Sequence, residues 1–397
     1  MTGRGMLRRG LLLLAAPLLA LAVALVISSI ALLLSHHSPL STYSKMVSYG
    51  VCSKAFPDAP CTAESMVSIL DRAVPYFLSA LAVAIGFRMA LFNIGVGGQY
   101  HMAAVLAAGL GAAVSLPAPL HVAFILAVAV VTGAMWAGIA GLLKVTRGVS
   151  EVISTIMLNF IGGGLSTYLL VTFFKAGGSD NLSGASKTLP TSAWFPSLNP
   201  LLKALGLTAG DTDLYGFAIV AIVVGIGYSI LLQRTRFGFD LRASGVNPWA
   251  AQASGVAQKG MVVKTMLISG AIAGLVGMPH LLGFAHKYSN DFPAGLGFTG
   301  ITVALLGRNR PIGMVLGAIL IGFLERSAQV LDLNGIPKEI VVIMQGTIVL
   351  SVVVAYEVVR RAEVAAAERA VRRRLDSDDG PDAGPPPEPQ ASAAVPV

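Results

Sequence analysis

The feature that most constrains this sequence is a series of long apolar runs, among them Leu11–Leu34 and residues 119–143. A helix rises about 1.5 Å per residue, so about 20 apolar residues are enough to cross the hydrocarbon layer of a membrane. Lipid cannot hydrogen-bond exposed backbone, which leaves helices and closed barrels as spanning structures. Barrel strands alternate polar and apolar residues, whereas these runs are continuous. The sequence therefore predicts an all-α polytopic integral membrane protein.

The apolar runs predict about ten transmembrane segments, some of them short or broken. After the first run they cover residues 74–91, 99–116, 119–143, 152–173, 215–232, 264–285, 299–307, 312–331 and 339–359. The chain is 55% hydrophobic and 12% charged, with a mean hydropathy of +0.74. Its apolar surface therefore exceeds what one water-soluble core requires. Residues 11–359 are thus expected to form one membrane domain.

The basic residues predict the orientation of these segments, because cytoplasmic loops of membrane proteins are rich in Lys and Arg. With the N-terminus (1–10) in the cytoplasm, the cytoplasmic parts also include 144–151, 233–263, 308–311 and 360–397. These parts hold most of the basic residues, and the external loops 35–73 and 174–214 hold few. The net charge of +8 therefore reflects membrane topology, and we expect no nucleic-acid partner.

Two further regions carry less information. Cys52 and Cys61 fall in the first external loop, where they form either a disulfide or two free thiols, and no metal-ligand spacing surrounds them.

Residues 360–397 begin as a basic, Ala-rich helix with Glu357/Arg361 and Glu368/Arg372 at i,i+4 spacing and end in a Pro- and Asp-rich tail. That tail cannot build a core and is expected to be disordered, while the basic helix suits a surface of anionic lipid headgroups.

Polar residues and glycines interrupt the apolar pattern at "ALFNIGVGGQYHMAA", residues 90–104. Asn93, Gly95, Gly98 and Gln99 lie there at a helix boundary. Such residues serve close helix packing, or they mark unwound backbone, which membranes tolerate only where protein buries it or water lines it. A second interruption, "AGLGFTGITVALLGRNRPIGMVLGA" at 294–318, includes Thr299, Arg308 and Asn309. Interrupted segments in both halves of a chain are typical of a transport pathway.

A third polar element is "EVISTIMLNFIGGG", residues 151–164. On a helix, Glu151, Thr155 and Asn159 share one face. Polar groups on an apolar span usually face the bundle interior or a water cavity. Asn159 is therefore a candidate for a pathway or an interhelix contact.

The loop 233–263 predicts a small rigid helix at the cytoplasmic surface. Asn247 is a good N-cap, Pro248 suits the first helical position, and Gly255 ends the helix after about two turns. The helix presents one aromatic side chain, Trp249, and it has the form of a knob that fits a groove on a cytoplasmic partner.

No catalytic constellation, metal cluster or phosphate-binding loop of the form G-x-x-x-x-G-K-[ST] occurs in the sequence. The chain is therefore not expected to be an enzyme. Two functions remain: a stand-alone secondary transporter or channel, or the membrane subunit of a pump whose ATPase is a separate chain.

Four segments in the same order resemble permease subunits of ATP-binding-cassette importers: "LFNIGVGGQY", "EVISTIMLNFI", "LRASGVNPWAAQASGV" and "GFTGITVALLGRNRPIG". The similar group contains branched-chain amino acid, ribose and simple-sugar permeases, and within it the nucleoside-type members are nearest. The resemblance covers about residues 65–355. It favours the pump subunit over the stand-alone transporter.

The resemblance implies alternating access driven by ATP and Mg in partner ATPases, with no cofactor bound by this chain. It also implies a second related permease, an external substrate-binding lipoprotein, and a bacterial plasma membrane with both termini cytoplasmic. The helix with Asn247, Pro248, Trp249 and Gly255 would be the coupling helix. The translocation pathway would involve Asn93, Gly95, Gly98, Gln99, Asn159, Thr299, Arg308 and Asn309. Nucleosides are the expected substrate, followed by simple sugars and branched-chain amino acids.

Overall fold

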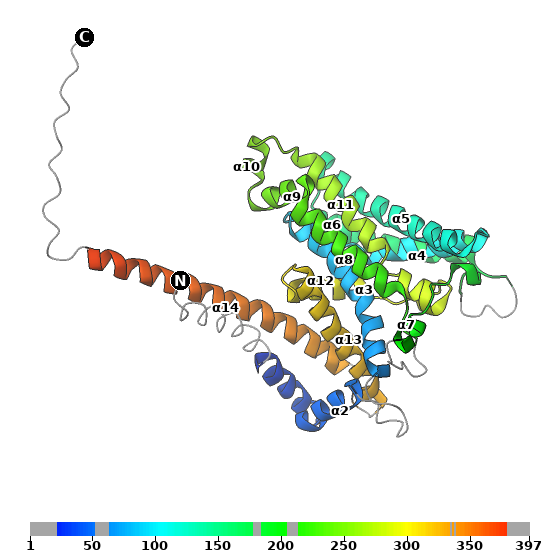
Figure 1. Ribbon diagram of the computed structural model, residues 1–397, viewed down its shortest axis with the longest axis horizontal. Coiled ribbons are helices and arrows are strands. Elements are labelled where there is room, and N and C mark those ends of the chain that lie inside the picture. The colour runs from blue at the N-terminus through cyan, green and yellow to red at the C-terminus, as the bar shows by residue number, and fades with distance from the viewer. Residues whose placement is uncertain are drawn as a thin grey trace, which may run out of the picture. The chain divides into compact units, whose positions relative to one another are not determined.

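The computed structural model describes residues 22–51, 63–177, 184–204, 213–333, 336 and 339–378. The chain divides into a compact unit, Val26–Val349, and a second unit composed of Met1–Leu25 and Leu350–Val397. In the described residues regular structure is helical, and the extended pairs are isolated bridges such as Lys175 with Ser186. The predicted all-α membrane fold is confirmed (Figure 1).

The helices follow the apolar segments in chain order. After a first helix, Ala22–Leu34, the longer helices of the first half are α2 (Pro39–Val51), α3 (Ala63–Phe87), α4 (Val96–Ala113), α5 (Ala118–Arg147) and α6 (Glu151–Leu169). Short π- and 3-10-helices, η1 (Leu170–Phe174) and η2 (Thr191–Ala193), and α7 (Asn199–Ala204) follow. The second half contains α8 (Phe217–Arg234), α9 (Arg236–Val246), α10 (Pro248–Ala253), α11 (Gln258–Gly274), η3 (His280–Ala285), α12 (Leu296–Leu306), α13 (Pro311–Leu333) and α14 (Glu339–Asp378).

Five of the described helices are long and apolar enough to cross a membrane, or six if the bent pair Ala22–Leu34 and Pro39–Ser48 is one span. Leu296–Leu306 and Glu339–Ala355 are shorter apolar helices, as the sequence indicated for residues 299–307. Helices α4 and α11 are not among the five. Polar residues in the first turns of α4 lower its mean hydropathy, and α11, with 17 residues, is slightly too short. The count of about ten spans therefore stays a prediction.

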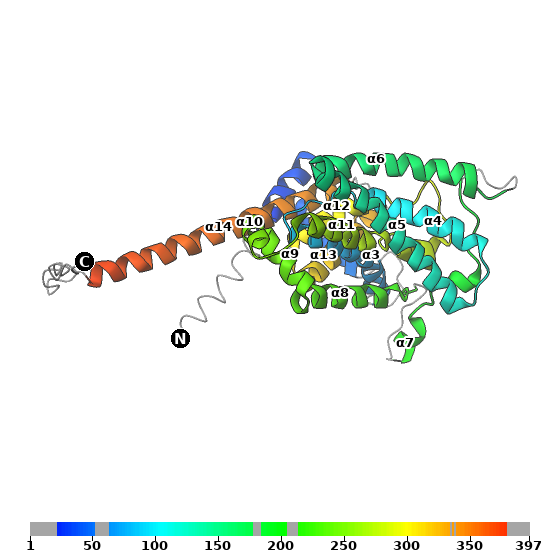
Figure 2. The same ribbon diagram turned by 90° about the horizontal axis from the view of Figure 1, so that it is seen from above.

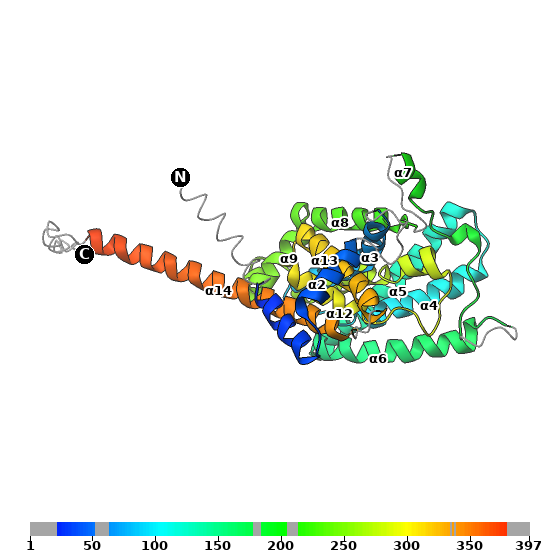
Figure 3. The same ribbon diagram turned by 90° about the horizontal axis from the view of Figure 1, so that it is seen from below.

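Helix α3 lies at the centre of the compact unit. Within its apolar window 78% of residues are buried, against 28% in α5 and 22% in α6. It packs against α11, α12 and α13, while α6 and α8 lie on opposite flanks (Figures 2 and 3). The outward faces of the flanking helices are apolar, with Phe160 of α6 75% exposed and Met135 of α5 67% exposed. Such exposed apolar surface is expected where lipid covers a protein.

Small residues allow α5 and α11 to approach closely. A Cβ atom added to Gly270 would lie 2.3 Å from the Gly133 carbonyl oxygen, and one added to Gly274 would lie 2.1 Å from that of Ala129. The small residues repeat at every fourth position on both helices, which is how membrane helices bring their backbones together. This contact fixes α11, which carries a side chain of the site described below.

Two predicted loops contain more helix than expected. Range 35–73 holds α2 and the first turns of α3, and range 174–214 holds η2 and α7. The apolar run of α3 begins at residue 74 because Asp71 and Arg72 interrupt it, yet the helix continues through both residues. Cys52, Cys61, the N-terminal segment 1–10 and the tail 379–397 lie outside the described residues. The basic helix predicted after residue 359 is confirmed up to Asp378, with Arg361 Nε 2.8 Å from Glu357 Oε1.

Candidate functional site

The first glycine-rich interruption is a break between α3 and α4. The chain leaves α3 at Phe87, turns at Ala90 with φ 54°, and has no regular structure over residues 91–94. Asn93 within this break is fully buried, and α4 begins at Val96 inside the bundle. The predicted unwound backbone at a helix boundary is confirmed, and protein buries it.

Side-chain amides hold the first break together. Asn93 and Gln99 exchange two hydrogen bonds, with Nδ2 to Oε1 at 3.0 Å and Nε2 to Oδ1 at 2.9 Å. Asn93 also accepts from the Gly95 amide at 3.0 Å and donates to Ser269 Oγ of α11 at 2.8 Å. Gln99 is 1% exposed and Ser269 is fully buried, so these bonds satisfy the Gly95 amide and the side-chain amides in place of water.

The polar face of α6 closes the same break from the other side. Thr155 Oγ1 accepts from the Ile94 amide at 3.3 Å. Asn159 accepts from the Gly98 amide and donates to the Ile94 carbonyl, both at 2.7 Å. These bonds give the face an interhelix contact, which is one of the two roles that the sequence left open for Asn159. Glu151, buried at the start of α6, pairs with Lys144 at 2.5 Å.

The second interruption is a tight turn between α12 and α13. Arg308 and Asn309 have φ values of 54° and 55°, and Pro311 begins α13. Arg88, the residue after α3, donates from Nη2 to the Asn309 carbonyl at 2.8 Å. Near the start of α12, a Cβ atom added to Gly297 would lie 2.7 Å from the Gly97 amide nitrogen. The two interruptions, distant in sequence, are therefore in contact.

The predicted pathway residues fall into two groups. Asn93, Gly95, Gly98 and Gln99 are buried, and their polar groups bond to protein. The others are at least partly exposed: Asn159, Thr299, Arg308 and Asn309. Close helix packing, one of the two interpretations of the glycine-rich stretch, describes the geometry of the first group. Contact of either group with a solute stays a prediction.

A pocket of about 480 Å³ opens at the end of the bundle opposite α10, and it was missed in the sequence. Its lining comes from α3, η3, α12, α13, the residues before α8, and the segments that flank η3. Its aromatic and polar side chains are Ser68, Asp71, Arg72, Tyr76, Asp213, Tyr215, His280, Phe284, Glu325 and Gln329. Leu296, the residue before the Gly297 contact, forms part of its wall. Because the distribution of basic residues predicts that this end faces outward, we call this cavity the outer pocket.

Charged groups of the outer pocket contact neighbouring polar or charged groups. Arg72 donates from Nη2 to Gln329 Oε1 at 2.8 Å and lies 4.0 Å from Glu325. Asp71 Oδ1 accepts from the Tyr215 amide at 3.1 Å. Burial and the carboxylates of Asp71 and Asp213 raise the pKa of Tyr215, so its hydroxyl stays protonated. Glu325 of α13 thus makes an interhelix contact with Arg72 of α3, and the sequence signal for the pocket was the Asp71-Arg72 pair.

The predicted knob at residues 247–255 is confirmed as α10, which lies at the other end of the bundle from α7 (Figure 1). Asn247 Oδ1 accepts from the amides of Trp249 and Ala250, both at 3.1 Å. Gly255 follows the helix with φ 89°, a conformation that suits glycine. The Trp249 side chain is 81% exposed and therefore available to a partner.

Two histidines, His121 and His101, have hydrogen-bond partners within the bundle. His121 contacts Ser192 Oγ at 2.9 Å and the Gly111 carbonyl at 2.9 Å, and His101 contacts the Tyr288 hydroxyl at 3.0 Å. Among the described residues, no three His, Cys, Asp or Glu side chains are placed to hold a metal ion.

Comparison with known proteins identifies similar sequences. The family model "Branched-chain amino acid transport system / permease component" matches residues 65–353. The chain is 36% identical over 291 residues to the guanosine ABC transporter permease protein NupP of Bacillus subtilis, covering 73% of this chain and 81% of NupP. It is 32% identical to the nucleoside permease protein NupB of Lactococcus lactis (76% and 82% covered) and 30% identical to the glucose permease protein TsgB13 of Haloferax volcanii (76% and 78%). No solved structure matches.

Proposed function

Because the chain belongs to the family of branched-chain amino acid transport system permease components, we propose that it is the membrane subunit of an ATP-binding-cassette importer for nucleosides. The observation that carries this proposal is its similarity, over most of its length, to permeases named for guanosine and nucleosides. A permease subunit is not an ATPase. The hydrolysis of ATP therefore belongs to another chain.

The outer pocket supports a nucleoside as the substrate. Its volume of about 480 Å³ lies in the range typical of small-molecule sites. Tyr76, Tyr215 and Phe284 offer aromatic faces on which a base can stack. Gln329 and Glu325 offer polar groups for ribose hydroxyls or base edges. We propose that solute enters the bundle here.

A simple sugar is the second candidate, favoured by the similarity to a permease named for glucose. A sugar would use the polar groups of the outer pocket and gain less from its flat aromatic faces. Competition binding with the partner lipoprotein separates the two: displacement by guanosine but not by glucose supports the nucleoside.

We propose the following partners. Cytoplasmic ATPases supply the ATP and Mg site, a second related permease completes the membrane part, and an external lipoprotein delivers the substrate. The family's permease role implies an ATPase and a substrate-binding protein in general terms. The cell would be bacterial, with the chain in its plasma membrane and both termini in the cytoplasm, as the distribution of Lys and Arg indicates.

A chain of contacts connects α10 with both interruptions. Helix α9 packs on the end of α3, where a Cβ atom on Gly245 would lie 2.1 Å from the Arg88 carbonyl oxygen. Gln258 of α11 donates to Ser244 Oγ of α9 at 3.0 Å. Arg88 in turn holds the Asn309 carbonyl. Movement of α10 by an ATPase would therefore reach the breaks beside α3 and α12.

We propose that these breaks are the moving parts of alternating access. Closing of the ATPases would pull α10. This movement would shift α9 and Arg88 and open the contact between Gly97 and Gly297. Solute would then pass from the outer pocket toward the α10 end. Affinity would reside mainly in the external binding protein, since the membrane site must release what it receives.

Reconstitution tests the pump against the stand-alone transporter. The chain is placed in proteoliposomes with and without its co-expressed partner subunits, and uptake of radiolabelled guanosine is measured with and without ATP. We expect uptake only with the partners and ATP. Uptake by the chain alone without ATP would establish the secondary transporter or channel instead.

Substitution of Trp249 tests the coupling helix. Trp249→Glu should reduce ATP-driven uptake at least tenfold because it places a charge where an aromatic ring docks. Trp249→Phe keeps a ring, and Gln252→Glu adds a charge to an exposed position of the same helix, so both should retain most uptake. Full uptake by Trp249→Glu, with normal membrane insertion, would exclude the knob from coupling.

A further inference from the structure

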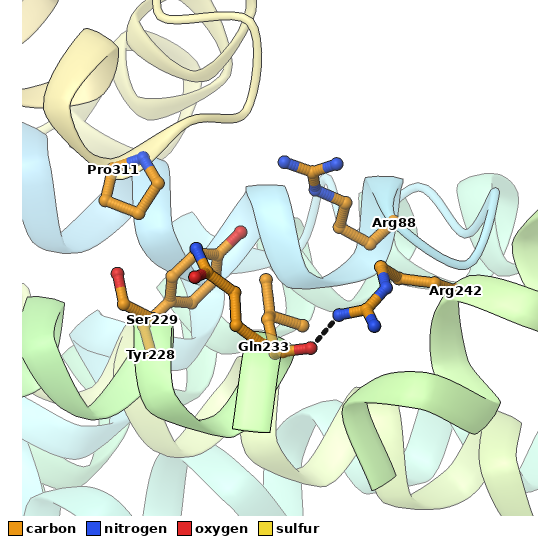
Figure 4. Close-up of a pocket in the computed structure, with 7 residues that line it drawn as sticks. Arg88, Tyr228, Ser229, Gln233, Arg242 and Pro311 are labelled. Carbon is orange, nitrogen blue, oxygen red and sulfur yellow. Dashed lines mark hydrogen bonds between the residues drawn. The ribbon is translucent and has the colours of Figure 1, made fainter. Parts of the chain in front are cut away.

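A second pocket lies at the α10 end of the bundle, where α3 and α8 end and α13 begins. It has a volume of about 410 Å³. Figure 4 shows the side chains that face it: Arg88, Tyr228, Ser229, Gln233, Arg242 and Pro311. None of them belongs to the outer pocket, and we call this cavity the basic pocket.

The basic pocket is rich in donors and positively charged. The guanidinium groups of Arg88 and Arg242 line it, and no carboxylate is among its lining residues. Arg242 donates to the Leu232 carbonyl, and Arg88 donates to the Asn309 carbonyl, so within the described part of the chain both guanidinium groups have neutral acceptors only. Arg88 Nε is buried and has no acceptor among the described residues. Two cations without a counter-charge favour an anionic ligand.

The basic pocket lies where lipid headgroups are expected. It forms at the ends of apolar helices, at Phe87 of α3, Arg234 of α8 and Pro311 of α13. Ends of spanning helices lie in the polar region of a bilayer, where phosphate groups are located. Basic pockets between membrane helices at this level suit anionic headgroups.

An apolar groove follows the same three helices toward the outer pocket. It has a volume of about 350 Å³ and is lined by apolar side chains, among them Phe77 of α3, Ile222 of α8 and Ile319 of α13. Along α13 the groove begins at Val315, about one turn after Pro311 of the basic pocket. A molecule with a charged head and an apolar tail would match both cavities.

We propose that the basic pocket binds the phosphate group of an anionic phospholipid whose acyl chain follows the groove between α3, α8 and α13. The phosphate would bridge Arg88 and Arg242, with Ser229 and Gln233 as further donors. It would thereby connect the end of α3 with α9, the helix that precedes α10. This site is independent of which solute the protein carries.

Thermal unfolding of the purified protein in a neutral detergent tests the site. Phosphatidylglycerol should raise the unfolding temperature, while phosphatidylcholine and inorganic phosphate should not. Arg88→Gln and Arg242→Gln should each weaken the apparent affinity for phosphatidylglycerol about tenfold or more, since each removes a charge-assisted bond. Arg236→Gln makes the same charge change at an exposed position of α9 outside the pocket and should leave the affinity unchanged.

A second variant keeps the test valid if the arginine variants unfold. Gln233→Glu alters an exposed residue and places a carboxylate in the basic pocket. This variant should fold, and its response to phosphatidylglycerol should be lost because its own carboxylate pairs with the arginines. An equal response to inorganic phosphate would show a free-anion site and overturn the lipid assignment. Equal responses to phosphatidylcholine, or an unchanged response in Gln233→Glu, would also overturn it.

Discussion

The two interruptions of the bundle are held in different ways. The break between α3 and α4 is interior. The side chains of Asn93, Thr155 and Asn159 bond to its backbone, and those of Gln99 and Ser269 hold the Asn93 amide in place. The turn between α12 and α13 is more exposed and is held by backbone bonds, such as Asn309 N–H to the Ala304 carbonyl at 2.8 Å and Arg310 N–H to the Gly307 carbonyl at 3.0 Å.

This difference predicts where substitutions are costly. A backbone-held turn tolerates new side chains if they accept its φ values. A break held by buried side chains does not, because each loss leaves a donor or acceptor without water or protein. The first break should therefore be sensitive to side-chain chemistry and the second to backbone conformation.

The largest effect is expected for Asn93→Leu. Leu has a similar volume but leaves the buried Gln99 amide, the Gly95 amide and Ser269 with fewer partners. At about 1–3 kcal/mol for each unsatisfied group, the free energy of unfolding should fall by about 4 kcal/mol. Denaturant titration in detergent micelles measures this. A loss below about 1 kcal/mol would contradict the side-chain-held break.

A smaller loss is expected for Gly98→Ala. The added Cβ atom would lie 2.7 Å from the Leu158 carbonyl oxygen, so α6 must move away from α4. Overpacking of this kind costs about 1–3 kcal/mol. Gly163→Ala on α6 is the matched control, because a Cβ atom there meets nothing within 4 Å. The control should keep or slightly raise stability, and equal losses in both variants would refute the packing argument.

Asn159→Ala should cost about 2 kcal/mol in the same titration. It removes the acceptor of the Gly98 amide and the donor to the Ile94 carbonyl, which are two hydrogen bonds of about 1 kcal/mol each. Because the same groups fix α6 to the break, uptake should fall as well. Wild-type stability in this variant would show that α6 does not hold the break.

The smallest effect is expected for Asn309→Gly in the second interruption. Glycine accepts the φ of 55°, and the Asn309 carbonyl still receives the Arg88 bond. The change in unfolding free energy should stay below about 0.5 kcal/mol, whereas Asn309→Val should cost about 1–3 kcal/mol through backbone strain. Equal costs for glycine and valine would remove the contrast between the two interruptions.

Local signals predicted some features to the residue, and long-range packing decided the others. Asn247, Pro248 and Gly255 specify α10 because capping and termination depend on neighbouring residues only. The outer pocket was not predictable in this way, because Asp71 and Glu325 come together only when α3 packs on α13. Asp71 and Arg72 even obscured the start of α3, since they interrupt an apolar run that the helix continues through.

The buried break was predictable as an interruption but not as a sealed one. Asn93 and Gln99 are compatible with either a water-lined path or an interhelix contact. Ser269, the partner that completes the network, lies far along the chain on α11, with no motif that marks it. Only the close approach of α11 to α3, where Ser269 donates to the Ala82 carbonyl at 2.5 Å, brings it there.

The mechanism that we propose requires the α3–α4 break to open during transport. Hydrogen exchange measured by mass spectrometry tests this claim on the reconstituted importer, at rest and during ATP turnover. We predict slow exchange at rest for a peptide covering residues 91–99, because the amides of Ile94, Gly95 and Gly98 are bonded to side chains, and clearly faster exchange during turnover. A peptide from the middle of α5 should exchange equally in both conditions. Equal protection of residues 91–99 with and without turnover would contradict the claim.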